Sequence, residues 1–279
     1  MKLSIITVNL NNRDGLQKTI DSVVSQTFHD FEWIVIDGGS TDGSRELIEQ
    51  YAERFAYWVS EPDKGIYNAM NKGVKVANGE YCLFLNSGDS LYKASTLEAV
   101  FSKKHSEDLF WGRILYCVSE DRQFEIGMKG MDFSAFELFQ RSLPHQACFI
   151  KRDVLVADGM YDESYRIVSD LKFFYSSVMR KQHSMAYVDI LVSVMDGNGI
   201  SSDLEKNKEE EDRLFCEFYP NRLLKDYHRW LQLKEENVKY KNREQYYHNA
   251  MVLYDFVKKH PALRKLHTLF YKIALKSLS

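Results

Sequence analysis

Cysteine is scarce in this 279-residue sequence, and its few cysteines stand far apart. None belongs to a CxxC pair or has a histidine at zinc-finger spacing; the four are Cys82, Cys117, Cys148 and Cys216. A disulfide framework and a structural zinc site are therefore not expected. A reducing, cytoplasmic location fits this cysteine usage best.

Long apolar runs are also missing. The N-terminal stretch MKLSIITVNLNN reaches three asparagines before an apolar core of signal-peptide length accumulates. No later run approaches the roughly 18 apolar residues of a membrane span. We therefore expect a protein that is neither secreted nor integral to a membrane. Its composition, 44% hydrophobic and 28% charged, is that of a globular chain.

A large net charge is the third absence, because the formal net charge is only −3. The charge is unevenly distributed, since residues 222–279 carry 13 Lys/Arg against 5 Asp/Glu, which leaves −11 for the first 221 residues. An acidic main part repels phosphate backbones, so nucleic acid is not an expected partner.

A regular alternation of strand and helix patterns fills the first 90 residues. Short apolar, β-branched runs predict strands at 3–8, 31–37 and 56–60, and a fourth within NGEYCLFLNSGD. Apolar residues at helical spacing separate these strands. Four strands with intervening helices predict one mostly parallel α/β sheet with helices on both faces.

Polar side chains stand where three of these strands end. Asn9 and Asn11 follow the first strand, Asp37 the second, and Asn86 with Asp89 the fourth. Ligands of open α/β sheets bind at the carboxyl ends of the strands, so these residues are expected to line one crevice. The alternative for Asp37 is an ordinary strand-to-helix turn with a helix cap.

The pattern from 91 to 200 is mixed. We expect three further strands, at 109–118, 145–150 and 183–195, and a helix at 168–181. We also expect a short amphipathic helix or loop at 133–140, a glycine-bearing loop at 196–202 and an acidic, solvated helix start at 203–212.

Three stretches occur in order in the first 90 residues: SIITVNLNN, VIDGGSTDGS and SEPDKGIYNAMNKGVKVANGEYCLFLNSGD. Together they closely resemble the nucleotide-sugar-binding half of glycosyltransferase family 2, an inverting family with the GT-A fold. The resemblance reaches more loosely to about residue 200 through LPHQACFIKRDVL and VSDLKFF.

The resemblance implies a GT-A domain over 1–202, with a nucleotide-binding half (1–90) and an acceptor half (91–202), and a helical extension over 203–279. It implies an enzyme that transfers a hexosyl or N-acetylhexosaminyl group, with inversion, from a nucleotide sugar, expected to be UDP-linked. The acceptor is a hydroxyl of a saccharide or lipid-linked saccharide in cell-surface polysaccharide synthesis.

The resemblance also assigns donor contacts. The residues that would hold the nucleoside are Thr7, Asn9, Asn11 and Asp37. The carboxylate of Asp37 can accept a hydrogen bond from a uracil N–H or a ribose hydroxyl. Lys64 would meet phosphate, or else form a surface ion pair with its neighbour Asp63.

The family's metal motif is of the Asp-x-Asp type, and Asn86-Ser87-Gly88-Asp89 stands in its place. Asp89 is then the expected ligand for Mg²⁺ or Mn²⁺, with Asn86 near the sugar or phosphate. Gly88 stands where the family often has a metal-binding aspartate, which leaves metal dependence an open question. The alternative is a plain polar turn.

Asp170, at the start of a helical pattern in YRIVSDLKFF, would be the general base. The alternative is a helix cap. We expect burial to raise the pKa of Asp170, which suits proton abstraction. His145 in LPHQ would contact donor phosphate or acceptor, or be structural. Trp111 would line the acceptor side, or belong to the core.

The tail ends in a basic amphipathic pattern over 262–279. Such a helix lies on an anionic membrane surface, or packs on the catalytic domain or on a second subunit of a homodimer. A membrane role would place a lipid-linked acceptor and the protein at the inner face of the cell membrane.

Two rival functions remain at this point. A sugar-nucleotide pyrophosphorylase uses a related sheet, but usually has a Gly-rich basic loop after its first strand, and TVNLNNRDG lacks it. A non-catalytic nucleotide-sugar-binding or scaffolding module would keep the crevice, and the departure at Asn86 and Gly88 keeps it open.

Overall fold

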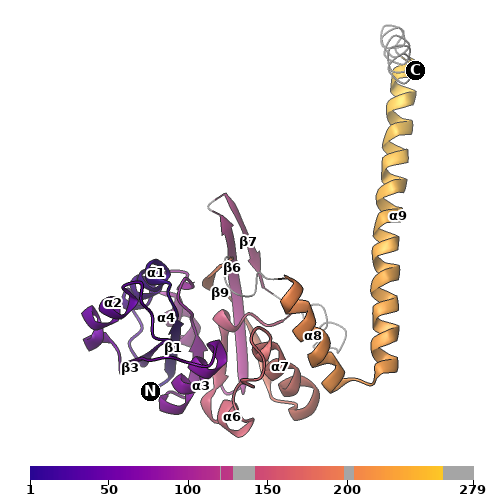
Figure 1. The fold of residues 1–279 in the computed structure, drawn as a ribbon. Helices are drawn as coiled ribbons and strands as arrows, with labels where there is room; N and C mark the ends of the chain where they lie inside the picture. The colour runs from indigo at the N-terminus through magenta and orange to yellow at the C-terminus, as the bar shows by residue number, and fades with distance from the viewer. Residues whose placement is uncertain (120, 128–141, 198–203, 260–279) are drawn as a thin grey trace. The chain divides into compact units, whose positions relative to one another are not determined.

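The computed structural model describes residues 1–119, 121–127, 142–197 and 204–259 (Figure 1). The chain divides into two compact units, Met1–Leu214 and Phe215–Ser279. The first unit holds the mixed α/β sheet, and the second holds the end of α8 and the long helix α9.

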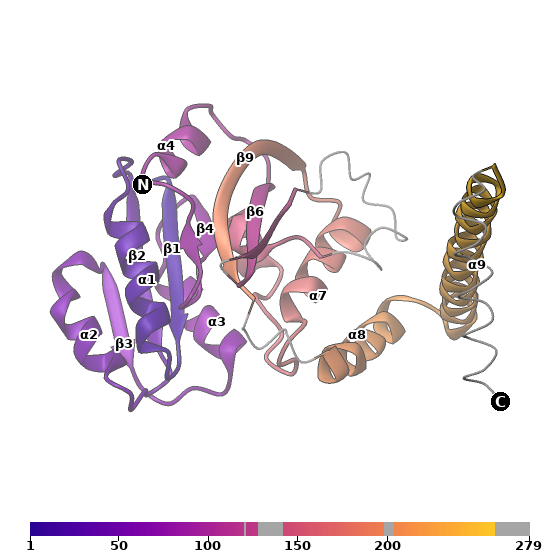
Figure 2. The same cartoon turned by 90° about the horizontal axis from the view of Figure 1, so that it is seen from above.

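The nucleotide-binding half predicted from the sequence forms a parallel four-strand arrangement in the order β3-β2-β1-β4. Its elements are β1 (Leu3–Asn9), α1 (Arg13–Val24), β2 (Phe31–Asp37), α2 (Ser44–Gln50), η1 (Ala52–Arg54), β3 (Tyr57–Ser60), α3 (Ile66–Val76) and β4 (Tyr81–Phe84). Figure 2 shows these four strands side by side. The predicted parallel sheet is confirmed.

The sheet continues from β4 in the order β8-β6-β9-β5, and β7 pairs with β6. The elements are β5 (Ser90–Leu91), α4 (Thr96–Phe101), β6 (Leu109–Ser119), β7 (Arg122–Ile126), η2 (His145–Ala147), β8 (Cys148–Lys151), α6 (Arg152–Ala157), α7 (Ser169–Ser176), η3 (Ser177–Lys181) and β9 (Met185–Asp196). Strand β8 is antiparallel to both β4 and β6, and it joins the two halves into one sheet.

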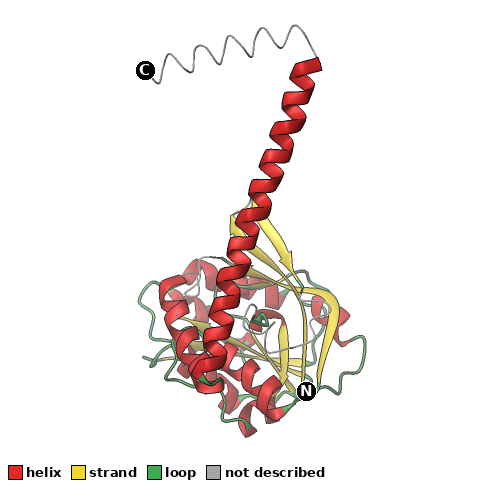
Figure 3. Ribbon diagram, turned by 90° about the vertical axis from the view of Figure 1, so that its right-hand side faces the viewer, coloured by secondary structure: helices red, strands yellow, loops and turns green. Residues whose placement is uncertain are grey.

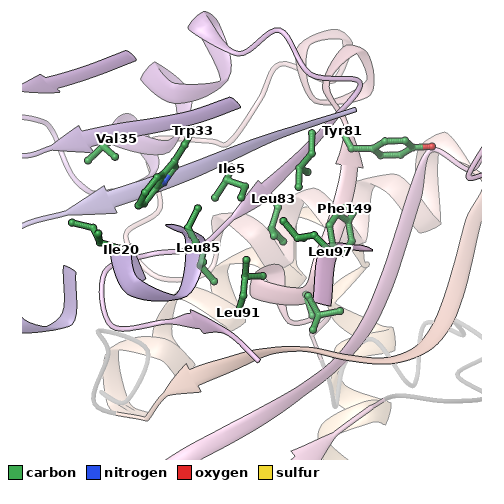
Figure 4. Packing of buried hydrophobic residues seen from close by; sticks show 14 of the residues in the cluster. Ile5, Ile20, Trp33, Val35, Tyr81, Leu83, Leu85, Leu91, Leu97 and Phe149 are labelled. Atoms are coloured by element: carbon green, nitrogen blue, oxygen red, sulfur yellow. The ribbon is translucent and has the colours of Figure 1, made fainter. Parts of the chain in front are cut away.

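Helices cover both faces of the sheet, as the alternation predicted. Successive strand residues point to opposite faces, so Ile5 joins one core cluster and Ile6 the other. The first cluster contains buried residues of α1, α2 and α4, and Figure 4 shows part of it. The second contains residues of α3, α6 and α7. A Cβ on Gly73 would lie 2.5 Å from Ile6 Cγ2, so the glycine lets α3 approach β1 closely.

Strand register aligns the polar residues at one edge of the sheet. Asn9 at the end of β1 pairs with Asp37 at the end of β2, and Asp37 pairs with Ser60 at the end of β3. The loop after β4 begins at the same edge, since Leu85 N donates to Ile6 O and Ser87 N to Val8 O. The carboxyl ends of the parallel strands therefore meet, as expected.

One predicted strand begins later than its sequence pattern suggested. Residues 145–147 form a short 3-10 turn after Pro144, and β8 starts only at Cys148. The turn lifts His145 out of the sheet. The predicted element at 133–140, the loop residues from 198 to 202 and the basic pattern at 262–279 lie outside the described residues.

The last two described helices are α8 (Leu204–Phe218) and α9 (Asn221–Lys259). Figure 3 shows α9 as one uninterrupted helix. Among the helices that the structure describes, none is both long enough and apolar enough to cross a membrane.

Candidate active site

A cavity of about 670 Å³ opens where the carboxyl ends of the strands meet. Five of the residues proposed from the sequence line it: Asn9, Asn86, Asp89, His145 and Asp170. They come from the end of β1, the loop after β4, the turn η2 and the first turn of α7. The fold thus brings together side chains that are up to 161 positions apart in the sequence.

Asp37 lies beside this cavity as a fully buried carboxylate. Its Oδ1 accepts from Asn9 Nδ2 (2.7 Å) and Ser40 Oγ (2.5 Å), and its Oδ2 accepts from Ser40 N (2.9 Å) and Ser60 Oγ (2.6 Å). Burial raises the pKa of Asp37, but the hydrogen bonds from Ser40, Ser60 and Asn9 outweigh it and leave the pKa below its usual value. Protein donors therefore occupy the acceptor positions of this carboxylate.

Asn9 presents a polar atom that the protein does not satisfy. Its side chain is 3% exposed, and Oδ1 has no hydrogen-bond partner among the described residues. Nδ2 is committed to Asp37, so the amide cannot turn without losing that bond. A buried acceptor on a cavity wall indicates a contact for a ligand donor group.

Thr7 and Asn11 take structural contacts. Thr7 is fully buried, and its Oγ1 accepts from Trp33 Nε1 at 3.0 Å. Asn11 has a φ of 48°, and its Oδ1 accepts from Thr41 N at 2.9 Å, which ties the loop after β1 to the loop after β2. Neither residue lines the described cavity.

Lys64 and Trp111 lie differently from the cavity residues. Lys64 is exposed in the turn before α3, between Asp63 and Gly65, which both line the cavity. Trp111 is 3% exposed in β6 and packs in the second core cluster, with its ring 5.9 Å from that of Tyr187. This burial favours the core alternative for Trp111 over a place on the acceptor side.

Asp170 is held at both oxygens. His145 Nδ1 lies 3.0 Å from Oδ2, and the Tyr67 hydroxyl donates to Oδ1 at 2.8 Å. Burial raises the pKa of Asp170, but the hydrogen bond and charge of His145, followed by the Tyr67 bond, lower it below its usual value. The expected raised pKa is therefore wrong, because the hydrogen-bond partners of Asp170 outweigh its burial.

His145 connects this carboxylate to the loop after β4. Its Nε2 lies 3.4 Å from Asn86 Nδ2, and its side chain is 17% exposed. Burial lowers the pKa of His145, but the hydrogen bond and charge of Asp170 and the charge of Asp89 outweigh it, so the pKa is raised. The two carboxylates thus stabilise the charged form of His145 relative to an isolated buried imidazole.

Tyr67 was missed in the sequence. It belongs to the first turn of α3, in a helix whose apolar spacing explained its neighbours as core residues. The available signal was the residue type itself, because a buried tyrosine hydroxyl usually finds a polar partner.

Glu210 on α8 was missed as well. Its carboxylate accepts from the backbone N–H groups of Arg166, Ile167 and Val168, at distances from 2.8 to 3.2 Å. These residues lead directly into α7, which begins at Ser169. The acidic segment, expected to be only a solvated helix start, therefore fixes the loop that carries Asp170.

Gly88 departs from the family's metal motif for a steric reason. Its φ is +104°, a region that favours glycine, and a Cβ there would lie 3.2 Å from Asp196 Oδ2. The carboxylate of Asp196, at the end of β9, thus lies beside the position where the family often has an aspartate. This contact could not be predicted from the sequence, because the pattern places Asp196 in the loop at 196–202 and says nothing of its neighbour in space.

Asp89 and Asp196 are neighbouring carboxylates that both line the cavity. Asp89 Oδ1 accepts from Asp196 N at 3.1 Å; burial raises the pKa of Asp89 to about 6, against the lowering effect of the His145 charge. The described residues contain no cluster of three or more His, Cys, Asp or Glu around one point. Mg²⁺ usually takes one or two carboxylates and completes its shell with phosphate and water, so the pair fits a site that a diphosphate would complete.

The class of the protein follows from this fold and from comparison with solved structures. S. aureus TarS, residues 1–349, in complex with UDP-GlcNAc has a TM-score of 0.59 and 20% identity, over 71% of this chain and 59% of that chain. The mannosyltransferase PcManGT from Pyrobaculum calidifontis, with GDP-Man and Mn²⁺, has a TM-score of 0.57 and 15% identity, over 77% and 63%. The fold is GT-A.

Sequence comparison gives the family. The model of glycosyl transferase family 2 matches residues 4–151. A PGL/p-HBAD biosynthesis glycosyltransferase of Mycobacterium tuberculosis is 33% identical over 221 residues, 76% of this chain and 83% of that protein. An uncharacterized glycosyltransferase of Rickettsia prowazekii is 26% identical over 222 residues, 73% and 68% of the two chains. The chain belongs to glycosyltransferase family 2, which confirms the predicted family.

Proposed function

We propose that this glycosyltransferase moves a hexosyl or N-acetylhexosaminyl group, with inversion, from a UDP-sugar to a hydroxyl of a saccharide or lipid-linked saccharide. The observation that carries the proposal is the position of Asp170, an ionised carboxylate in the same cavity as Asn9 and Asp89. Membership of the family favours a transferase over a pyrophosphorylase.

The proposed reaction is a single displacement. The acceptor oxygen attacks the anomeric carbon, the bond from that carbon to the phosphate oxygen breaks, and the nucleoside diphosphate leaves with the bonding pair. Asp170 takes the proton of the attacking hydroxyl as the new bond forms. Attack from the face opposite the leaving group inverts the anomeric centre.

The donor would be held by the residues at the strand ends. Asn9 Oδ1 would accept a hydrogen bond from the nucleoside, and Asp37, with Thr7 and Asn11, would keep Asn9 and the adjoining loop in place. Lys64 would approach the diphosphate from the turn before α3.

Asp89, with Asp196, would hold Mg²⁺ or Mn²⁺ against that diphosphate, with Asn86 beside the sugar or phosphate. A bound divalent ion would supply charge neutralisation as the diphosphate leaves. The related fold of PcManGT was solved with Mn²⁺, and that of TarS with UDP-GlcNAc, which supports testing both a metal and a uridine nucleotide.

The first experiment is calorimetric titration of the whole chain with UDP, GDP and CDP, each with and without Mn²⁺. We expect UDP to bind and Mn²⁺ to strengthen it, and we expect Asp89→Ala to lose most of the Mn²⁺ effect. Binding of GDP instead would change the donor class. No binding of any nucleotide would favour the scaffolding module and contradict the proposal.

The acceptor and location are proposals of the same kind. Relatives that are 33% identical to this chain are named for PGL/p-HBAD biosynthesis. A basic amphipathic pattern at 262–279 would suit a lipid-linked acceptor at the inner face of the cell membrane. We expect the protein to sediment with anionic vesicles, and much less with neutral ones. Equal behaviour with both kinds would remove the membrane role and leave a second subunit as the partner to test by light scattering.

A further inference from the structure

The hydroxyl of Tyr67 makes a contact that an assignment of Asp170 as a lone base leaves unexplained. Tyr67 is 5% exposed in α3 and lines the cavity. Its hydroxyl lies 2.8 Å from Asp170 Oδ1 and 2.5 Å from the carbonyl oxygen of Ile167. Ile167 belongs to the loop that leads into α7, so the single hydroxyl proton lies between two acceptors, the Asp170 carboxylate and the backbone that carries it.

Two separate elements hold the two oxygens of this carboxylate. Tyr67 reaches Oδ1 from α3, and His145 reaches Oδ2 from η2 at 3.0 Å. The terminal torsion of an aspartate is broad, so a single contact would leave the carboxylate able to rotate. Contacts at both oxygens fix its plane. Each oxygen has two acceptor positions, so the carboxylate, which also has a backbone hydrogen bond from Leu171, keeps capacity to accept from a substrate hydroxyl.

We propose that Tyr67 is a positioning residue for Asp170: with His145, its hydroxyl fixes the carboxylate plane toward the acceptor and keeps the carboxylate ionised. The inference rests on the proposed function, in which Asp170 is the base. Tyr67 itself exchanges no proton with the substrate.

The charged and titratable groups around Asp170 support this role. His145 faces it from η2, with Asp89 behind, while Tyr67 and Tyr161 face it from the side of α3. Glu210 and Glu211 of α8 hold the preceding loop and line the cavity, respectively. Burial, followed by the charge of Asp170, raises the pKa of Tyr67 well above its usual value, so its hydroxyl stays a donor.

A neighbouring tyrosine supplies a matched control. The ring of Tyr161 lies 5.5 Å from that of Tyr67, and its hydroxyl is buried without a hydrogen-bond partner among the described residues. Tyr161→Phe therefore removes the same atom from the same cluster and leaves both bonds to Asp170 in place. Tyr67→Phe removes one of them.

The test is carbon-13 NMR of the whole chain labelled at the aspartate carboxyl carbons, with the Asp170 signal assigned by its loss in Asp170→Asn. Loss of a hydrogen bond to a charged acceptor should raise the titration midpoint of Asp170 by about one pH unit. As the pH falls, the signal of Tyr67→Phe should therefore begin to move at a higher pH than the signals of the wild type and of Tyr161→Phe.

A second probe covers the case in which Tyr67→Phe fails to fold. Incorporated 3-fluorotyrosine at position 67 keeps the hydroxyl and makes it a stronger donor. 3-Fluorotyrosine at position 67 should shift the Asp170 carbon signal at pH 7 in the direction opposite to Tyr67→Phe. If Tyr67→Phe does not fold, the comparison is with 3-fluorotyrosine at position 161, which should leave the Asp170 signal unchanged. An Asp170 signal that responds alike to changes at 67 and 161 overturns the proposal.

The kinetic readout separates this inference from the proposed function. With Asp170 as the base, Tyr67→Phe should lower kcat about tenfold, leave nucleotide affinity within twofold and move the acid limb of the pH profile upward. Tyr161→Phe should leave that limb in place. Full turnover by Asp170→Asn would contradict the base assignment, yet the NMR result on Tyr67 would stand by itself.

Discussion

The carboxylates of the buried Asp37 and the half-buried Asp170 are both held by hydrogen bonds, but their partners come from different distances along the chain. The partners of Asp37 are Asn9, Ser40 and Ser60, which belong to adjacent parallel strands and the turn between them. Those of Asp170 are His145, 25 positions away, and Tyr67, 103 positions away. The contacts of Asp37 follow from strand register, whereas those of Asp170 form only when residues 1–90 and 91–202 pack together in the folded domain.

The chemistry of the partners differs in the same way. Neutral hydroxyl and amide groups stabilise the charge of Asp37, so that its state does not depend on another titrating residue above acid pH. A histidine with a raised pKa stabilises the charge of Asp170. The charge of Asp37 therefore rests on groups that do not titrate near neutral pH, whereas the charge of Asp170 rests partly on a histidine.

The largest effect is expected for Asp170, whose substitution should change turnover but not nucleotide affinity. Asp170→Asn should lower turnover at least about 100-fold, because general base catalysis contributes about 10² to 10⁴, while nucleotide affinity stays within twofold. Steady-state rates and calorimetry measure the two quantities. The matched control is Asp158→Asn, which alters a second His–Asp pair, with His183 at 2.8 Å, outside the cavity lining. Near-normal rates for Asp170→Asn would show that the base lies elsewhere.

The next largest effect is expected for Asp37 and is measured as a change in the free energy of unfolding. Asp37→Asn would turn an amide nitrogen toward donors at Ser40 and Ser60, which should cost about 1–3 kcal/mol of unfolding free energy in urea at pH 7. The pKa of Asp37 is lowered on folding, so its stabilisation is present above the unfolded value and is lost as pH falls through the folded value. The difference from wild type should shrink in acid. A constant difference would contradict the charge argument.

The smallest expected effect concerns the interaction between Asp170 and His145. The pKa of His145 is raised on folding, so its stabilisation is present below the unfolded value of about 6.5 and is lost as pH rises through the folded value. Without the carboxylate of Asp170, burial should dominate, and the NMR titration midpoint of His145 should fall by about one pH unit in Asp170→Asn. An unchanged midpoint would mean that Asp170 does not set the charge of His145.

Most of the nucleotide-binding half was predictable from the sequence, because each strand and helix there has its own apolar period and polar stop. The convergence of Asn9 and Asp37 followed from parallel register alone. Tyr67 and Asp196 were not predictable in this way. Their roles depend on α3 meeting the loop before α7 and on β9 ending beside Gly88.

The predicted direction of the pKa shift of Asp170 was wrong for a related reason. Burial is visible in a hydrophobic pattern, but the hydrogen-bond partners that reverse its effect are not. Trp111 shows the opposite case: its apolar strand context in β6 was a better guide to its place than the residue type, which also suits sugar stacking.

The contacts of Glu210 decide where the chain can be shortened. A fragment ending at residue 202 would keep every cavity residue up to Asp196, yet it would remove the carboxylate that receives the N–H groups of residues 166–168. The part-buried donors of Ile167 and Val168 would be left without partners shortly before Asp170. A minimal enzyme must therefore extend at least through Leu214, where the first compact unit ends.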